Sequence, residues 1–222
     1  MNSHALSAGQ LRLYLVTDDR GRSPGELERI VSQALQGGVT AVQFREKCAA
    51  PSFCVKAFAR LSAICREHAA PLLLNADLLG RFELLHEPDG VHFSERTLPL
   101  HAHEVARLAG YSAHNLEEAS HAVEHGVDFC TLSPIFETPS KAGLLPPLGL
   151  EALREARRAS PQLTIVALGG IDETNAAGCI RAGASGIAVM RAIMNSDDPL
   201  DAARRLSTVI YETLEQLSKG FT

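Results

Sequence analysis

Short apolar segments alternate along this chain with longer segments that are apolar on one face only. The short segments have the length and character of buried strands, and the longer ones repeat apolar residues at helical spacing. We predict strands at 11–17, 41–45, 71–75, 90–94, 110–114, 128–135, 164–168 and 186–190. We predict helices at 24–36, 51–68, 78–86, 101–108, 116–125, 150–160, 174–183 and 199–217, with a long loop at 136–148.

An unbroken series of strand–helix units predicts an α/β protein of the (β/α)8 TIM barrel class. An open, doubly wound sheet is the alternative. Its first strand would lead into a glycine-rich dinucleotide turn, but here that strand is followed by Thr17-Asp18-Asp19-Arg20-Gly21. No linker or low-complexity segment divides the chain. We therefore expect one barrel domain over residues 11–222, preceded by a flexible N-terminal tail at 1–10.

Composition narrows the class of protein without changing the fold. The 222 residues are 45% hydrophobic and 21% charged, with a net charge of −5, and no basic run favours nucleic acid as a partner. No apolar run is long enough to span a membrane and the N-terminus lacks a secretory signal, so we expect a cytoplasmic protein. The five cysteines form no CxxC pair and are expected to be reduced. The sequence leaves open whether the chain forms a homo-oligomer.

Two strand ends near the C-terminus have the pattern of a phosphate site. Ala167-Leu-Gly-Gly-Ile171 and Gly186-Ile-Ala-Val-Met-Arg191 are both apolar strands that run into tight turns. In TIM barrels, the turns after strands 7 and 8 present backbone N–H groups to phosphate. We therefore expect Gly169, Gly170, Met190 and Arg191 to bind a phosphorylated ligand.

Charged side chains follow the second strand, in Gln43-Phe-Arg-Glu-Lys47. Alternation along a strand points Gln43, Arg45 and Lys47 the same way, toward the barrel mouth. Cations in that position need an anionic partner. The partner is either a barrel acid, such as Asp18 or Glu46, or an anionic ligand, which we favour because catalytic groups of barrels lie at the strand ends.

His114 ends the fifth strand, where an imidazole is suited to proton transfer near neutral pH or to capping the next helix. His92 is interpreted as a histidine of the barrel core. His121 and His125 have metal-ligand spacing but no third ligand, so no metal site is predicted. The remaining candidates for substrate binding are polar residues at other strand ends, namely Asn75, Ser112, Thr138, Ser140 and Lys141.

The ordered set of these segments resembles the thiamine phosphate synthase/TenI family. The matching segments are Tyr14–Asp18, Val42–Lys47, Asp89–His92, Gly110–His114, Ser133–Phe136 with Thr138–Lys141, Ala167–Ile171 and Ala182–Val189. The resemblance implies a (β/α)8 barrel that binds a phosphorylated thiazole, and one of two activities. Synthases use Mg²⁺ to join a hydroxymethylpyrimidine pyrophosphate to a thiazole phosphate and release pyrophosphate. TenI-type tautomerases shift a proton that aromatises a thiazole carboxylate phosphate, without a metal.

The chain departs from the synthase pattern at the metal ligands that the resemblance implies. Synthases carry Asn-Asp after the third strand and a second Asp five residues after the histidine of the fourth, whereas this chain has Asn75-Ala76 and Thr97. Mg²⁺ prefers carboxylate oxygens, so their loss weakens the support for a departing pyrophosphate. A further departure is Arg191, where synthases usually have Ser.

These departures lead us to expect a TenI-like thiazole tautomerase, an isomerase without a cofactor. The resemblance then makes His114 the proton shuttle and places Arg45 and Lys47 on the carboxylate side. The first alternative is a thiamine phosphate synthase, a transferase with Mg²⁺, in which Asp77 or Glu95 replaces the missing carboxylates. The second is a non-catalytic protein that binds thiazole phosphate or thiamine phosphate.

Overall fold

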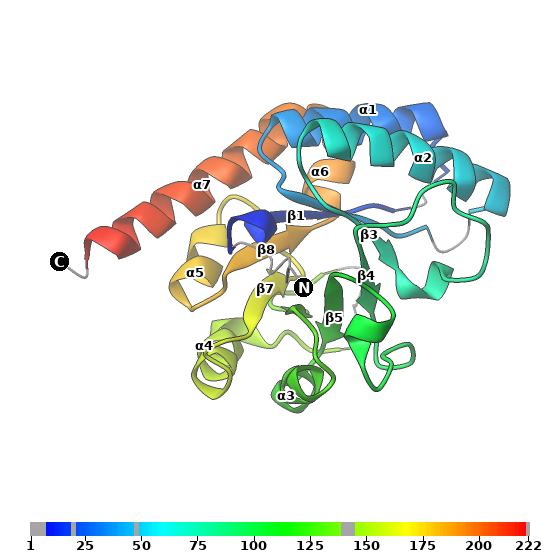
Figure 1. The fold of residues 1–222 in the computed structure, drawn as a ribbon. Helices are drawn as coiled ribbons and strands as arrows, with labels where there is room; N and C mark the ends of the chain where they lie inside the picture. Colours follow the sequence, from blue (N-terminus) through cyan, green and yellow to red (C-terminus); the bar gives the residue numbers. More distant parts are fainter. Residues whose placement is uncertain (1–7, 19–20, 47–48, 139–144, 221–222) are drawn as a thin grey trace.

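Parallel strands form a closed barrel (Figure 1). The computed structural model describes residues 8–18, 21–46, 49–138 and 145–220. Each strand pairs with the next along the chain, and β8 pairs with β1, which confirms the (β/α)8 prediction. The strands are β1 (Leu13–Val16), β2 (Ala41–Phe44), β3 (Leu72–Asn75), β4 (Gly90–Phe93), β5 (Ala109–Ala113), β6 (Phe129–Leu132), β7 (Thr164–Leu168) and β8 (Gly186–Val189).

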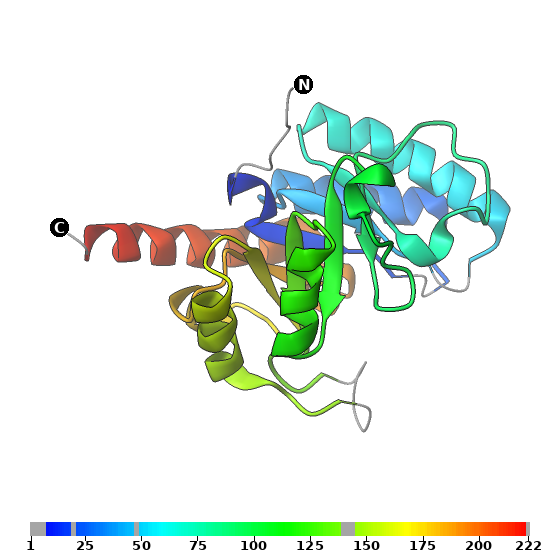
Figure 2. The same ribbon diagram turned by 60° about the horizontal axis from the view of Figure 1, so that its bottom comes forward.

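The α-helices surround the barrel unevenly. They are α1 (Pro24–Gln36), α2 (Pro51–Glu67), α3 (Leu116–Glu124), α4 (Gly149–Ala159), α5 (Ala176–Arg181), α6 (Arg191–Met194) and α7 (Pro199–Lys219). Successive contacts run α2, α1, α7, α5, α4, α3, and the end of α7 projects beyond the barrel in both ribbon views (Figures 1 and 2). No helix in the described ranges is long and apolar enough to cross a membrane.

The connections β3–β4 and β4–β5 contain only short 3-10 turns, η2 (Ala76–Leu78) and η3 (Ala102–Glu104). The helices predicted at 78–86 and 101–108 are therefore wrong. Gly80, with φ of 72°, takes the left-handed conformation that interrupts the first of them. The second segment has no side-chain cap at its start, and so short a helix is marginal without one. A third 3-10 turn, η1 (Ala8–Leu11), precedes β1.

Three helices, α1, α3 and α7, begin at a side-chain cap, whereas α2 and α4 do not. Ser23 accepts a hydrogen bond from the Glu26 amide ahead of α1, whose first residue is a proline. Asn115 caps α3 and Asp198 caps α7 in the same way. Each of these side chains satisfies a first-turn N–H group that has no partner within the helix. The caps therefore fix where the strand-end loops stop.

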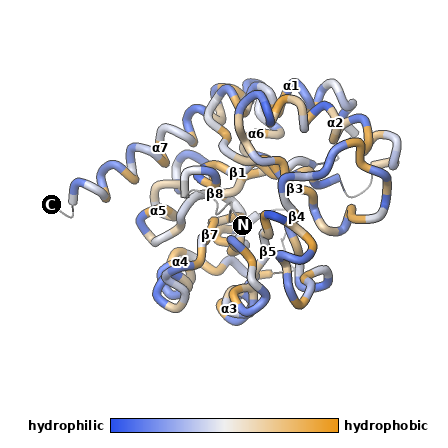
Figure 3. The backbone as a smooth tube through the Cα atoms, in the orientation of Figure 1, coloured by the Kyte–Doolittle hydropathy of each residue, from blue (hydrophilic) through white to orange (hydrophobic). Residues whose placement is uncertain are grey.

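Alternation along the strands divides the core into two layers. Side chains facing outward pack against the helices, as Phe44 of β2 does against Phe58 of α2, with ring centroids 5.6 Å apart. Helices α1 and α7 have both hydrophilic and hydrophobic residues in turn along their length (Figure 3), as expected for helices with one face on the barrel. The inward side chains fill the barrel with a separate cluster of Leu11, Tyr14, Ala41, Leu73, Leu108, Phe129, Val166 and Ala188.

The cysteines of the described ranges lie in the interior. Cys54, Cys65, Cys130 and Cys179 are buried and are not joined in disulfides. Burial raises the pKa of Cys65, Cys130 and Cys179 to about 12. These thiols are packing groups rather than nucleophiles. Cys48 lies outside the described residues.

Barrel closure predicts a strong effect of substituting Gly186. A Cβ at this position would lie 1.8 Å from the carbonyl oxygen of Leu11, where β8 meets the start of β1. We expect Gly186→Ala to lower the free energy of unfolding by about 3 kcal/mol or more, because backbone must move to relieve the overlap. The measurement is denaturant unfolding. Gly25→Ala is the control, since a Cβ there meets only Arg60 Nη1 at 3.6 Å, and an equal loss in both variants would contradict the explanation.

Candidate active site

A cavity of about 820 Å³ lies at the carboxyl ends of the strands. This is the end of a TIM barrel at which active sites occur, and the volume suits a small-molecule ligand. Of the site residues predicted from the sequence, those that line the cavity are Gln43, Arg45, Asn75, Ser112, His114, Thr138, Gly169, Gly170, Met190 and Arg191. The other three, Lys47, Ser140 and Lys141, lie outside the described residues.

The ends of β7 and β8 bring backbone close to the cavity. Gly169 and Gly170 have φ of 103° and 66°, and a Cβ on Gly170 would lie 2.4 Å from the carbonyl oxygen of Glu137. Only glycine fits this approach without strain. The short helix α6 starts at Arg191, directly after β8, and the N–H groups of a first helical turn lack helical partners. Both strand ends therefore bring backbone close to the same part of the cavity wall.

Arg191 belongs to this wall and does not point away from it. Its Nη2 donates to the hydroxyl oxygen of Thr138 at 2.8 Å, which joins the end of β8 to the loop after β6. Both residues line the cavity. The guanidinium is half-buried, so it adds positive charge beside the glycine turn.

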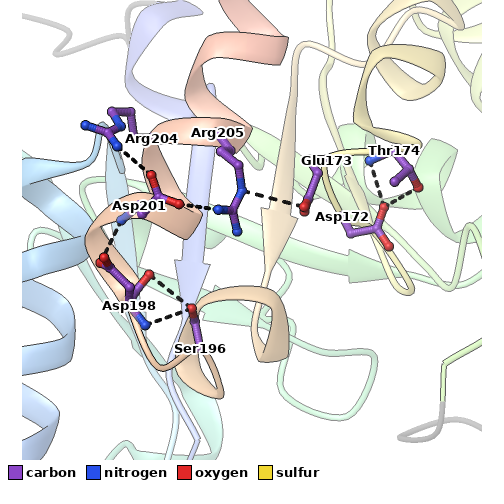
Figure 4. Close-up of polar contacts among 8 residues, drawn as sticks. All are labelled: Asp172, Glu173, Thr174, Ser196, Asp198, Asp201, Arg204 and Arg205. Carbon is purple, nitrogen blue, oxygen red and sulfur yellow. Dashed lines mark hydrogen bonds and ion pairs between the residues drawn. The ribbon is translucent and has the colours of Figure 1, made fainter.

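The segment after β7 is held in place from its outer side (Figure 4). Asp172, which lines the cavity, accepts hydrogen bonds from the amide and hydroxyl of Thr174 at 2.9 and 2.6 Å. Glu173 lies 3.6 Å from Arg205 of α7, and Arg205 also pairs with Asp201. The Glu173–Arg205 pair joins the loop to α7, and because it is exposed its contribution is weak.

The neighbouring wall is built around the ends of β1 and β2, because β1 pairs with β8. Thr17 donates to Glu46 Oε1 at 2.7 Å and accepts from the amide of Arg45 at 3.0 Å. Arg22 pairs with Asp18 and donates to the Met194 carbonyl at 2.7 Å. The first contacts fix the backbone from which Arg45 enters the cavity wall, and the last joins the end of β1 to α6.

A line of hydrogen-bonded side chains crosses the cavity floor. Gln43 Nε2 donates to the Tyr14 hydroxyl at 3.1 Å, and that hydroxyl lies 3.2 Å from His92 Nδ1. His92 Nε2 lies 3.0 Å from the Ser112 hydroxyl. Burial raises the pKa of Tyr14, and burial followed by the charge of Arg45 lowers the pKa of His92 to about 3. Both rings are therefore uncharged at neutral pH.

His114 has a defined hydrogen-bonding partner. Its Nδ1 lies 2.8 Å from the carbonyl oxygen of Ser133, so Nδ1 carries the proton and Nε2 keeps its lone pair when the ring is neutral. The capping role considered for His114 belongs instead to Asn115, whose side chain accepts from the Glu118 amide at 2.8 Å. His114 remains a cavity residue with one nitrogen available.

The described residues do not fit a Mg²⁺ ion held by protein carboxylates. The Thr97 hydroxyl accepts from the Ser94 amide at 2.8 Å, and Asn75 Oδ1 accepts from the Asp77 amide at 3.2 Å. Asp77 and Glu95 line the cavity, but within the described ranges no three His, Cys, Asp or Glu side chains gather as a metal site. A hard cation that prefers several oxygen ligands has no preformed protein cage here.

Several cavity residues were not among the predicted site residues. Arg96 and Asp172 line the wall, as does Asn195 beyond α6. Arg96 and Asp172 both follow directly after strands, which is a usable signal. The contribution of α6 was missed because a four-residue helix leaves no periodic pattern. The Tyr14 hydroxyl was missed because it stands inside an apolar strand.

Several proteins similar to this chain carry the name thiamine-phosphate synthase. The chain is 40% identical to the thiamine-phosphate synthase of Chloroflexus aurantiacus over 92% of this chain and 95% of that protein. It is 39% identical to the synthase of Albidiferax ferrireducens, over 94% and 95%. The solved thiamine phosphate pyrophosphorylase of Pyrococcus furiosus superposes with a TM-score of 0.80 at 31% identity, covering 93% of this chain and 98% of that one.

The tautomerase prediction is wrong. It rested on the two absent carboxylates at Ala76 and Thr97, whereas the relatives named as synthases match this chain over nearly its whole length. Two local substitutions in one part of the cavity wall carry less information than agreement along the entire barrel. The relatives therefore support an enzyme and favour the synthase alternative over the tautomerase.

The model of one protein family matches most of the chain. It is described as thiamine monophosphate synthase, and it matches residues 13–193, from the first strand to the helix after the last. Together with the relatives above, this match shows that the chain belongs to the thiamine monophosphate synthase family.

Proposed function

We propose that this protein is a thiamine phosphate synthase. It joins a hydroxymethylpyrimidine pyrophosphate to a thiazole phosphate and releases pyrophosphate as the bond between the two rings forms. The observation that carries this proposal is 40% identity to a protein of that name over 92% of the chain. The relationship covers every strand whose end lines the cavity.

The cavity supports the proposal because its walls suit a phosphate at one side and a second anion at the other. The thiazole phosphate binds the backbone N–H groups at Gly169, Gly170, Met190 and Arg191, with the Arg191 side chain beside it. Arg45 receives the pyrophosphate group from the neighbouring wall at the end of β2, and guanidinium geometry favours paired hydrogen bonds to phosphate oxygens. This arrangement would hold the two rings between the two anions.

Positive charge at Arg45 then assists the bond-breaking step. Negative charge grows on the pyrophosphate as it leaves, and a fixed cation in a partly dry cavity stabilises it. From the sequence alone, Lys47 is proposed to assist Arg45, and Ser140 and Lys141 are proposed to bind substrate. His114, Asn75 and Thr138 complete the substrate-binding set, and the single lone pair at His114 Nε2 offers an acceptor for a ring substituent.

Synthase activity is tested directly with both substrates. Purified protein is incubated with the pyrimidine pyrophosphate, the thiazole phosphate and Mg²⁺. We expect thiamine phosphate and pyrophosphate to appear in equal amounts, because one bond forms for each that breaks. Chromatography measures the product, and calorimetry measures binding of the thiazole phosphate alone. Tight binding without any product would contradict the transferase and support the non-catalytic binder.

Arginine substitutions test the two anion sites separately. We expect Arg45→Ala to lower kcat about 100-fold, since the side chain stabilises charge that develops during the reaction. Arg191→Ala is expected to raise KM for the thiazole phosphate about tenfold with a smaller change in kcat, as for the loss of a charged hydrogen bond. Arg60→Ala is the control, because this exposed side chain pairs with Glu28 on the outer helices. If both cavity variants raise the same KM, the two anions have been assigned to the wrong walls.

A further inference from the structure

We propose that Tyr14 and His92 are positioning residues that fix the hydroxyl of Ser112 as a hydrogen-bond donor to the ligand. The direction of these hydrogen bonds is a property of the protein without substrate. Their effect on turnover rests on the proposed function. The two parts are therefore tested by different measurements.

The geometry supplies a continuous line from the barrel interior to the cavity. It runs from Gln43 through Tyr14 and His92 to Ser112, with separations of 3.1, 3.2 and 3.0 Å. Tyr14, Gln43 and His92 are each at most 3% exposed, so water does not compete for these groups. Phe129 packs edge-on against both rings, at centroid distances of 5.7 Å to Tyr14 and 5.5 Å to His92. The rings are held in place and cannot swing to other partners.

The amide nitrogen of Gln43 determines which hydrogen bond Tyr14 accepts and which one it donates. An amide nitrogen only donates, so the Tyr14 oxygen accepts this bond and must place its own proton elsewhere. Among the described residues its one other polar neighbour is His92 Nδ1. If Nδ1 carried a proton, two donors would meet the oxygen and the hydroxyl proton would be buried without an acceptor. Tyr14 therefore donates to Nδ1.

The neutral His92 ring accepts a hydrogen bond at Nδ1 and therefore donates one at Nε2. The charged or titratable groups that act on its ring are Tyr14 from β1 and Arg45 at the end of β2, and neither favours a second proton. A neutral imidazole has one N–H group, which must lie on Nε2 when Nδ1 accepts. Nε2 then donates to the Ser112 oxygen at 3.0 Å. Thr131 lies farther away, at 3.5 Å.

Ser112 is left with a proton that points to the ligand. Its oxygen accepts from His92, and within the part of the chain that the structure describes no other protein acceptor bonds this hydroxyl. The side chain is partly exposed and lines the cavity. The hydroxyl proton is therefore available to an acceptor on the ligand, such as a phosphate oxygen or an unprotonated ring nitrogen.

Nitrogen NMR of the histidine side chains tests the direction in the protein without substrate. We expect His92 to carry its proton on Nε2 in the wild type and in Tyr111→Phe, and to populate the Nδ1–H form in Tyr14→Phe. Tyr111 is the matched control because it is equally buried and adjoins Ser112 on β5, but packs in the outer core. The His92 signal is assigned from its loss in His92→Gln. A wild-type proton on Nδ1 would overturn the proposal whether or not the protein is a synthase.

Kinetic coupling tests whether Tyr14 acts through Ser112. We expect Tyr14→Phe to lower kcat/KM about three- to tenfold, the usual effect of losing one neutral hydrogen bond. In a Ser112→Ala background the same change should have no further effect, because the group that it orients is gone. A merely structural role would lower kcat/KM equally in both backgrounds, which would overturn the proposal. Absence of turnover in the wild type, with the expected NMR result, would contradict the proposed function alone.

The pH dependence of unfolding tests the neutral state of His92. Its pKa is lowered to about 3 in the folded protein from an ordinary value of 6.5, so between these values the unfolded chain binds one more proton. Stability is therefore lost as pH falls, and the unfolding equilibrium constant rises about tenfold per pH unit from this group. We expect His92→Gln to remove this contribution between about pH 6 and pH 4. His86→Gln, at an exposed site, should leave this contribution in place. Equal slopes of unfolding free energy against pH in wild type and His92→Gln would overturn the assignment of His92 as neutral.

Discussion

The parallel pairing of β8 with β1 is the constraint on which the rest of the structure depends. It turns an open sheet into a ring, so all eight strand ends face one space and no edge is left unpaired. Closure requires the backbone of β8 to approach Leu11 so nearly that only glycine fits at position 186. The same closure brings α6 against the end of β1, where Arg22 bonds the Met194 carbonyl. Residues far apart in the sequence thereby share one cavity wall.

A second property follows from the alternation of side chains on that ring. Inward positions near the amino ends carry apolar groups, and those near the carboxyl ends carry Gln43, His92 and Ser112. Burying these polar groups costs little stability because each of them has a hydrogen-bond partner. The floor is also uncharged, so the charges of the described cavity lie on the wall, where three arginines and three acids line it. Charged groups of a ligand thus find their partners on the wall, and neutral rings can rest on the floor.

The barrel and most of the cavity residues could be predicted because they depend on local regularities. Strand length, apolar alternation and glycines at two strand ends place Arg45, Gly169 and Gly170 without any tertiary information. Other features depend on contacts that no local pattern encodes. The orientation of Arg191 is decided by Thr138, 53 residues away in sequence. The helix expected at 78–86 fails at Gly80, where backbone conformation outweighs apolar spacing. The activity was mispredicted because two absent carboxylates were given more weight than the similarity of the whole chain.

The absence of α-helices from the described residues that follow β3 and β4 affects which cavity side chains can change by mutation. Asn75, Asp77, Glu95 and Arg96 stand at the ends of β3 and β4, the two strands followed by 3-10 turns and loops instead of α-helices. Side chains there are not tied to the packing of a helix on the outer core, so changing them costs the fold little. This is the part of the barrel in which the chain differs from the synthase pattern at Ala76 and Thr97. The scaffold thus separates the half that carries the proposed phosphate site from a half in which side chains can change at little cost to the fold.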